Sequence, residues 1–78
     1  MPTVLRSGAS RFFYYSSDRS EPPHVHVERD EATAKFWLWP VRLQESGGFR
    51  PAEVRRIERL IERHRETLLR SWNVYFKE

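Results

Sequence analysis

The sequence contains no cysteine, so disulfide bridges and zinc sites built from thiolates are excluded. The same absence is typical of proteins in a reducing compartment. No stretch approaches the roughly 20 apolar residues of a membrane-spanning helix, and the N-terminus lacks the apolar core of a signal peptide. These absences predict a cytoplasmic protein that has no contact with a membrane.

A chain of 78 residues has room for one domain, which we expect to span residues 1–78. So short a chain buries a limited core and often gains stability from a partner or a metal. No phosphate-binding glycine loop, Ser/His/Asp arrangement or pair of catalytic carboxylates appears in the sequence. We expect no cofactor.

Lysine is scarce, because 12 of the 14 basic residues are arginine and only Lys35 and Lys77 are lysine. Arginine suits two-point contact with phosphate or carboxylate and stacks on aromatic rings. A GC-rich genome would also favour arginine codons, whatever the function. With 11 acidic residues and a net charge of +3, the composition predicts a modest basic patch rather than a basic tail.

The first half of the chain predicts a small antiparallel sheet of three to four strands. Residues 4–6 are a short apolar start, followed by a turn in which Gly8 supplies a positive φ. Alternation and aromatic content predict strands over residues 11–16, 24–28 and 32–39, with a short fourth strand over residues 41–43. Residues 17–23 and 44–49 are the expected loops.

From Pro51 onward the apolar period changes to about 3.6 residues, which predicts one long C-terminal amphipathic helix over residues 51–76. Pro51 suits the first helical turn, and Glu53 complements the positive end of the helix dipole. The apolar stripe comprises Val54, Ile57, Ile61, Leu68, Trp72 and Tyr75, widened by Leu60, Leu69 and Phe76. The expected fold class is therefore α+β.

One helix covers only one face of a sheet, so the opposite face should be aromatic and open. The face expected under the helix carries Val25, Val27, Phe36 and Leu38. The face expected to be open carries His24, His26, Trp37 and Trp39. Such a face is seldom bare on a monomer. We therefore predict a homo-oligomer or a hetero-complex, with Trp37 and Trp39 at the partner interface.

His24 and His26 lie two residues apart on one face of a predicted strand, about 7 Å from each other along the backbone. They are candidates for an acid/base pair that cleaves RNA, with one imidazole taking the 2′-hydroxyl proton and the other protonating the leaving oxygen. Two other interpretations stay open. The pair is structural, or it binds a metal together with Glu28 or His64.

A basic stripe runs along the predicted helix, because Arg56, Arg63 and Arg70 recur every seven residues and Arg55, Arg59 and Arg63 recur every four. From this stripe we select Arg55, Arg59 and Arg63. Together with Arg29 and Lys35, they are the candidate contacts to nucleic-acid phosphates. The alternative is a solvated helix face, whose arginines are neutralised by neighbouring Glu62 and Glu66.

The chain resembles a small bacterial family, the domain of unknown function 4160 family. The resemblance is carried by the start Met1 to Arg6, the Phe/Tyr-rich strand, the segment Glu21 to Val27, the segment Ala34 to Leu38, and a helix that ends near Tyr75. Members often have an acidic residue just before the proline, where this chain has Trp39. Genes of this family are often found beside a small partner gene.

The resemblance implies the toxin side of a toxin–antitoxin-like pair. We therefore expect a toxin-like module that binds an antitoxin-like protein and acts on RNA, with His24 and His26 as its catalytic residues. The alternative is a non-enzymatic regulatory module that binds protein or nucleic acid through its helix or its open sheet face.

Overall fold

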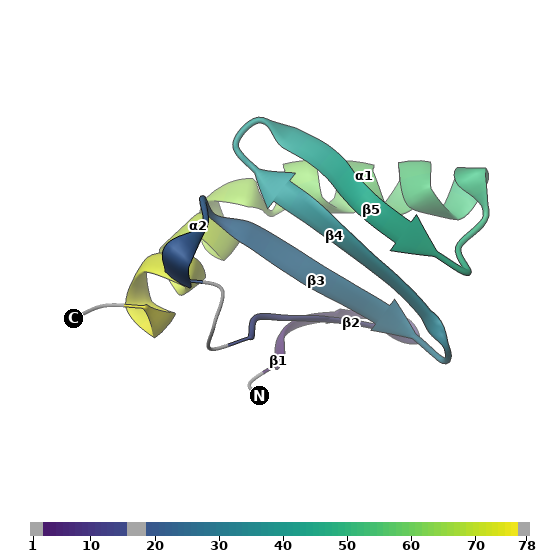
Figure 1. The fold of residues 1–78 in the computed structure, drawn as a ribbon, viewed down its shortest axis with the longest axis horizontal. Coiled ribbons are helices and arrows are strands. Elements are labelled where there is room, and N and C mark those ends of the chain that lie inside the picture. Colours follow the sequence, from purple (N-terminus) through teal and green to yellow (C-terminus); the bar gives the residue numbers. More distant parts are fainter. Residues whose placement is uncertain (1–2, 16–18, 77–78) are drawn as a thin grey trace.

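The computed structural model describes residues 3–15 and 19–76. Over these ranges the chain forms one antiparallel sheet followed by two helices, which confirms the α+β class (Figure 1). The strands are β1 Thr3–Ser7, β2 Ser10–Phe13, β3 His24–Arg29, β4 Ala32–Leu38 and β5 Val41–Gly47, and the helices are α1 Pro51–Arg63 and α2 Arg65–Tyr75. Ser16 of an expected strand and residues 17 and 18 of an expected loop lie outside the described residues.

The sheet has five strands, in the order β1-β2-β3-β4-β5, so the prediction of three to four is wrong. The apolar start of the chain is a full strand, which pairs with β2 through a turn at Gly8 with φ of +59°. At the other edge, β5 continues to Gly47, although the sequence predicts a loop from Gln44. Residues 42–47 are all exposed, and so this edge strand lacks the apolar alternation by which a strand is recognised.

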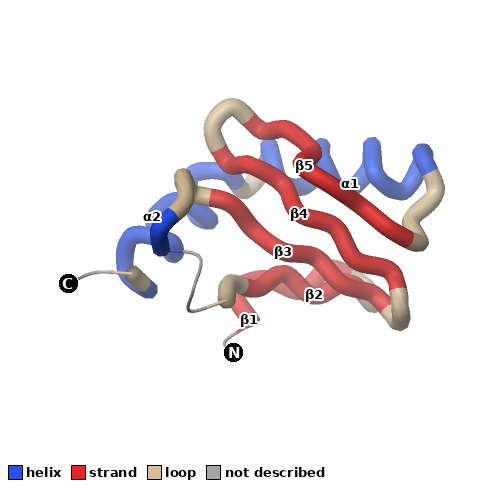
Figure 2. The backbone as a smooth tube through the Cα atoms, viewed as in Figure 1, coloured by secondary structure: helices blue, strands red, loops and turns tan. Residues whose placement is uncertain are grey.

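The prediction of one long helix is also wrong, because the chain bends at His64 and continues as a second helix. Helical hydrogen bonding persists across the bend. The His64 N–H donates to the Leu60 carbonyl at 3.1 Å, and the His64 carbonyl accepts from the Leu68 N–H at 2.9 Å. No glycine or proline marks this position, so the sequence carries no stop signal. Figure 2 shows α2 turned toward the start of β3.

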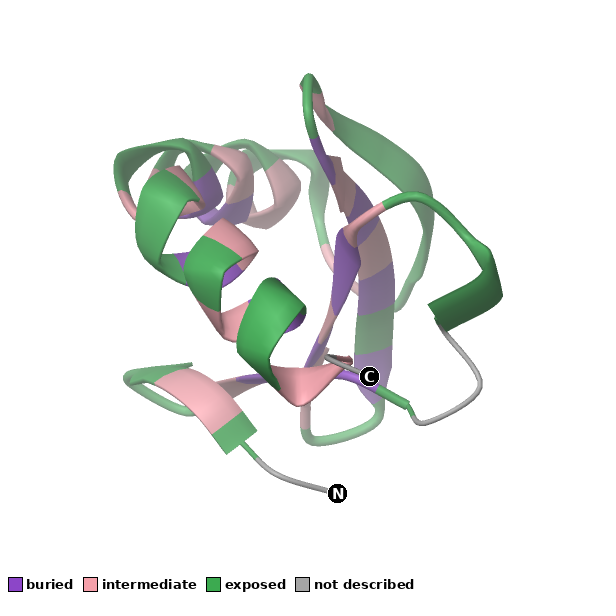
Figure 3. Ribbon diagram, turned by 90° about the vertical axis from the view of Figure 1, so that its left-hand side faces the viewer, coloured by how far each residue is buried: buried purple, intermediate pink, exposed green. Residues whose placement is uncertain are grey.

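Both helices lie on the same face of the sheet (Figure 3). The face predicted to be covered is confirmed, since Val25, Val27, Phe36 and Leu38 are fully buried in one core with the helices. The buried positions of the helices are Ile57, Ile61, Leu68 and Trp72, which belong to one stripe that continues through the bend. Within residues 3–15 and 19–76, no helix is long and apolar enough to cross a membrane.

Tyr14 joins the end of β2 to α2. Its hydroxyl donates a hydrogen bond of 2.8 Å to the Leu68 carbonyl, and its ring is fully buried. The aromatic rings of α2 surround it, with ring centroids 5.3 Å away for Trp72 and 5.7 Å away for Tyr75. Burial raises the pKa of the Tyr14 phenol to about 12.

We predict that Tyr14→Phe lowers the free energy of unfolding by about 1 kcal/mol, because it removes the buried hydrogen bond to the Leu68 carbonyl while keeping the ring. Urea unfolding followed by tryptophan fluorescence measures this change. Tyr75→Phe is the matched control, since the Tyr75 hydroxyl makes no hydrogen bond within the described part of the chain. Equal losses in the two variants would contradict the role of the Tyr14 hydroxyl.

The raised pKa of the Tyr14 phenol predicts that the fold loses stability in strong base. An unfolded tyrosine titrates near pH 10, whereas the folded-state pKa of Tyr14 is raised to about 12. A raised pKa stabilises the fold fully below about pH 10, and that contribution is lost as the pH rises through about 12. Urea unfolding across this interval should show a steeper decline for the wild type than for Tyr14→Phe. Parallel declines would overturn the assignment.

Candidate functional site

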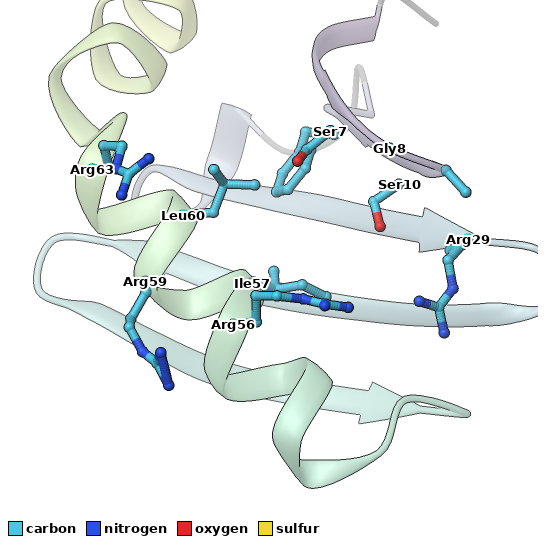
Figure 4. Close-up of a pocket in the computed structure, with 11 residues that line it drawn as sticks. Ser7, Gly8, Ser10, Arg29, Arg56, Ile57, Arg59, Leu60 and Arg63 are labelled. Atoms are coloured by element: carbon cyan, nitrogen blue, oxygen red, sulfur yellow. The ribbon is translucent and has the colours of Figure 1, made fainter.

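A cleft of about 550 Å³ lies between the turn that joins β1 to β2 and the outer surface of α1. Its charged lining residues are Arg29, Arg56, Arg59 and Arg63, and among the described residues no acidic side chain lines it. We call this concavity the arginine cleft. Figure 4 shows three of the arginines extending from α1 and Arg29 extending from the strand side.

The helix period explains how α1 gathers its three arginines. Arg56, Arg59 and Arg63 are spaced i, i+3 and i+7, which places them on one side of the helix. This side adjoins the apolar stripe, because Ile57 and Leu60 also line the cleft. The burial of Ile57 against the sheet therefore fixes the direction in which the neighbouring arginines leave the helix.

Arg29, the last residue of β3, reaches the first turn of α1. Its guanidinium forms an ion pair with the Glu53 carboxylate and lies 5.3 Å from the centre of the Phe49 ring. Glu53 in turn accepts a hydrogen bond of 3.0 Å from the backbone N–H of Arg50. That bond, followed by the contact with Arg29, holds the pKa of the Glu53 carboxyl below its ordinary value. Arg29 is thus oriented before any ligand arrives.

The three arginines of α1 differ from Arg29 in their electrostatics. In the ranges that the structure describes, Arg56, Arg59 and Arg63 form no ion pair, and the expected pairing with Glu62 and Glu66 is not seen. Guanidinium groups bind phosphate through two parallel N–H bonds. The arginine cleft therefore has the chemistry of an anion-binding site.

Two predicted phosphate contacts lie elsewhere. Arg55 is exposed on α1 and does not line the cleft. Lys35 lies in β4, where its ammonium is 2.7 Å from a Glu21 carboxylate oxygen and 5.0 Å from the centre of the Trp37 ring. Selection by the spacing of four includes Arg55 and omits Arg56, which the spacing of seven contains. Spacing of i, i+3 and i+7 beside the apolar stripe would have selected Arg56.

Of the two candidate histidines, His26 lies on the face of the sheet away from the arginine cleft, whereas His24 packs against Trp72 of α2. Phe12 lines the arginine cleft, whereas the next residue, Phe13, stacks on His26 with ring centroids 5.6 Å apart. Successive strand residues point to opposite faces, so the sheet separates His26 from the arginine cleft. Arg29, Arg59 and Arg63 are not brought to the histidines. Lys35, in contrast, lies beside the histidines, because it is the partner of His26 in the β3–β4 pairing.

The prediction that His24 lies on an open face of the sheet is wrong, because the exposed fraction of His24 is 0%. Its Nδ1 lies 2.9 Å from the Pro22 carbonyl oxygen, and its ring centroid is 5.1 Å from that of Trp72. The reason is the short pairing of β2, which reaches only residues 26–28 of β3. The start of β3 thus has no β2 neighbour, and Trp72 of α2 packs against it.

His26 is half-buried and completes an aromatic cluster with the other imidazole. The ring centroids of His24 and His26 are 5.1 Å apart, and Tyr15 meets His26 edge-on at 4.6 Å. The two imidazoles are thus neighbours, as the strand spacing predicts. Among the described residues, no group of three or more His, Cys, Asp or Glu side chains is arranged as metal ligands would be.

The predicted partner face is only partly open. Trp39 has an exposed fraction of 68%, and the Arg65 guanidinium lies 4.5 Å from the centre of its ring. Trp37 is half-buried, and its indole N–H donates a hydrogen bond of 3.1 Å to the Gln44 side chain. The exposed indole of Trp39 is the larger apolar surface of the two.

Comparison with known proteins bears on the whole domain rather than on the two sites. The profile of the family described as "Domain of unknown function (DUF4160)" matches residues 9–73, which include both histidines and all four arginines of the cleft. No curated protein and no solved structure matches the chain. The matched segment covers most of the sequence, and the chain therefore belongs to the DUF4160 family.

Proposed function

We propose that this domain is a nucleic-acid-binding regulatory module that holds the phosphates of RNA in the arginine cleft and acts in the cytoplasm. The single observation that carries the proposal is a concavity lined, in the described part of the chain, by four arginines and by no acidic side chain. In such a concavity the fields of the cations add, and they are offset in part by the Glu53 carboxylate, which pairs with Arg29 and interacts electrostatically with Arg56.

The arrangement of the arginines favours an extended polyanion. Arg56 and Arg63 are seven residues apart on α1, which separates their backbones by roughly 10 Å along the helix axis. One phosphate group is too small to span that distance, whereas successive phosphates of a nucleic-acid strand reach it. Arg29, held by Glu53, adds a fixed cation across the cleft.

The proposal includes a protein partner, either a second copy of the chain or an antitoxin-like protein. The support is the exposed indole of Trp39, which stands on the side of the molecule that carries Arg65. Tryptophan and arginine are the residues that most often anchor a protein interface. The arginine cleft would then be the nucleic-acid surface of an oligomer or a hetero-complex.

We predict that Arg56→Ala weakens the binding of single-stranded RNA about tenfold, because a charge-assisted hydrogen bond contributes roughly 1.5–3 kcal/mol. Arg55→Ala is the matched control, since it removes the same charge from the adjacent position outside the cleft. Fluorescence anisotropy with a labelled oligonucleotide measures both affinities. The slope of log affinity against log salt should fall by about 0.7 for Arg56→Ala. Equal effects of the two substitutions would refute the cleft as the binding site.

A second candidate function is a toxin-like ribonuclease, favoured by the separation of 5.1 Å between the imidazole rings of His24 and His26. Half-buried His26 would take the 2′-hydroxyl proton, and His24, which is fully buried in this structure, would have to become exposed to protonate the leaving oxygen. Lys35, opposite His26, would stabilise the charge that develops on the phosphate. RNA must then approach the face of the sheet away from the arginine cleft.

Expression of the wild type and of His26→Ala in separate bacterial cultures distinguishes the two candidate functions. The ribonuclease hypothesis predicts growth arrest and loss of total RNA with the wild type only, since His26 is the more accessible imidazole. Circular dichroism verifies that the variant is folded. Arrest by both proteins, or by neither, would remove the catalytic role and leave the binding module.

A further inference from the structure

We propose that the arginine cleft accepts a single nucleotide unit with a terminal phosphate monoester, as found at the phosphorylated end of single-stranded RNA or in a free nucleoside monophosphate. This inference rests on the proposed function and names the ligand of the same site. It depends on three properties of the cleft, which are its volume, its charge and the chemical difference between its walls.

The volume selects one nucleotide rather than a duplex. Sites for small molecules have volumes of about 300–1,000 Å³, and the cleft measures about 550 Å³. A duplex presents its phosphates on the outside of a rod, with its bases stacked and hidden. A concavity walled by the turn at residues 7–10 and by α1 admits an unstacked nucleotide at the end of a strand instead.

The charge selects a monoester. An internal phosphodiester carries one negative charge, whereas a terminal monoester carries about −1.5 to −2 at neutral pH. The cleft offers Arg56, Arg59 and Arg63, none of which has an ion-pair partner in the described segments, in addition to the Arg29–Glu53 pair. Arg56 and Arg29 extend toward each other in the space between α1 and the hairpin, whereas Arg59 points away from it (Figure 4). Two guanidinium groups that face one space match a dianionic phosphate better than a single diester.

The walls differ in a way that suits the rest of a nucleotide. On the helix side, half-buried Leu60 and the edge of Ile57 supply an apolar surface beside the arginines, against which a base can lie. On the hairpin side, Ser7 and Ser10 supply hydroxyl groups, and the Ser10 side chain points from the hairpin toward the cleft (Figure 4). Gly8 leaves open space, since no atom lies within 4 Å of a Cβ placed on it. The hydroxyls can therefore bond the ribose or the base edge.

The test compares ligands on the intact chain by fluorescence anisotropy of a labelled single-stranded RNA. RNA with a terminal phosphate should bind about tenfold more tightly than the same RNA with a terminal hydroxyl, through the extra charge-assisted bonds. Adenosine monophosphate should compete more strongly than inorganic phosphate, and adenosine should not compete. Ser10→Ala should reduce the advantage of the nucleotide over phosphate, whereas the control Ser46→Ala, an exposed serine of β5, should not.

The failures of the two proposals are distinguishable. If both RNA ends bind equally and adenosine monophosphate does not compete, the nucleotide inference is overturned, while the proposed function stands if Arg56→Ala still weakens RNA binding. If RNA does not bind but adenosine monophosphate binds directly in isothermal titration calorimetry, and Arg56→Ala abolishes that binding, the ligand is the free nucleotide and the RNA function is overturned. If no ligand binds, both proposals fail.

Discussion

One apolar stripe on the two helices packs on one face of the sheet, and this contact orders the rest of the molecule. Ile57 and Ile61 of α1 and Leu68 and Trp72 of α2 form a single core with the sheet. The hydrogen bond from Tyr14 to the Leu68 carbonyl fastens α2 to the end of β2. In the described part of the chain both helices lie on one face, so no helix covers the other face of the sheet (Figure 3).

This arrangement keeps the arginine cleft apart from the imidazoles of His24 and His26. The arginine cleft lies beside α1 and the β1–β2 turn, whereas His26 lies on the far face of the sheet and His24 is buried against Trp72 of α2. An RNA phosphate held by Arg56 is therefore not presented to the imidazoles of the same chain. Binding through the arginines and catalysis through the histidines are thus independent hypotheses.

Several of these features follow from residues that are close in sequence. Alternation over residues 24–28 correctly identifies Val25 and Val27 as core residues, and the 3.6-residue period identifies the helical stripe. The exposed strand β5 and the bend at His64 escape the sequence analysis, because neither has a local signal. A polar edge strand is defined by its pairing with β4, and the bend is defined by where α2 must pack.

The sequence by itself determined the element types, the covered face of the sheet, the neighbouring imidazoles and a basic stripe on α1. Only the tertiary structure decided that Arg29 joins that stripe across a cleft and that His24 is buried beneath Trp72. The physical reason is that a local period fixes the side of an element on which a residue lies. Where two elements meet depends instead on strand pairing and helix docking, which join residues such as Tyr14 and Leu68 that are far apart in the chain.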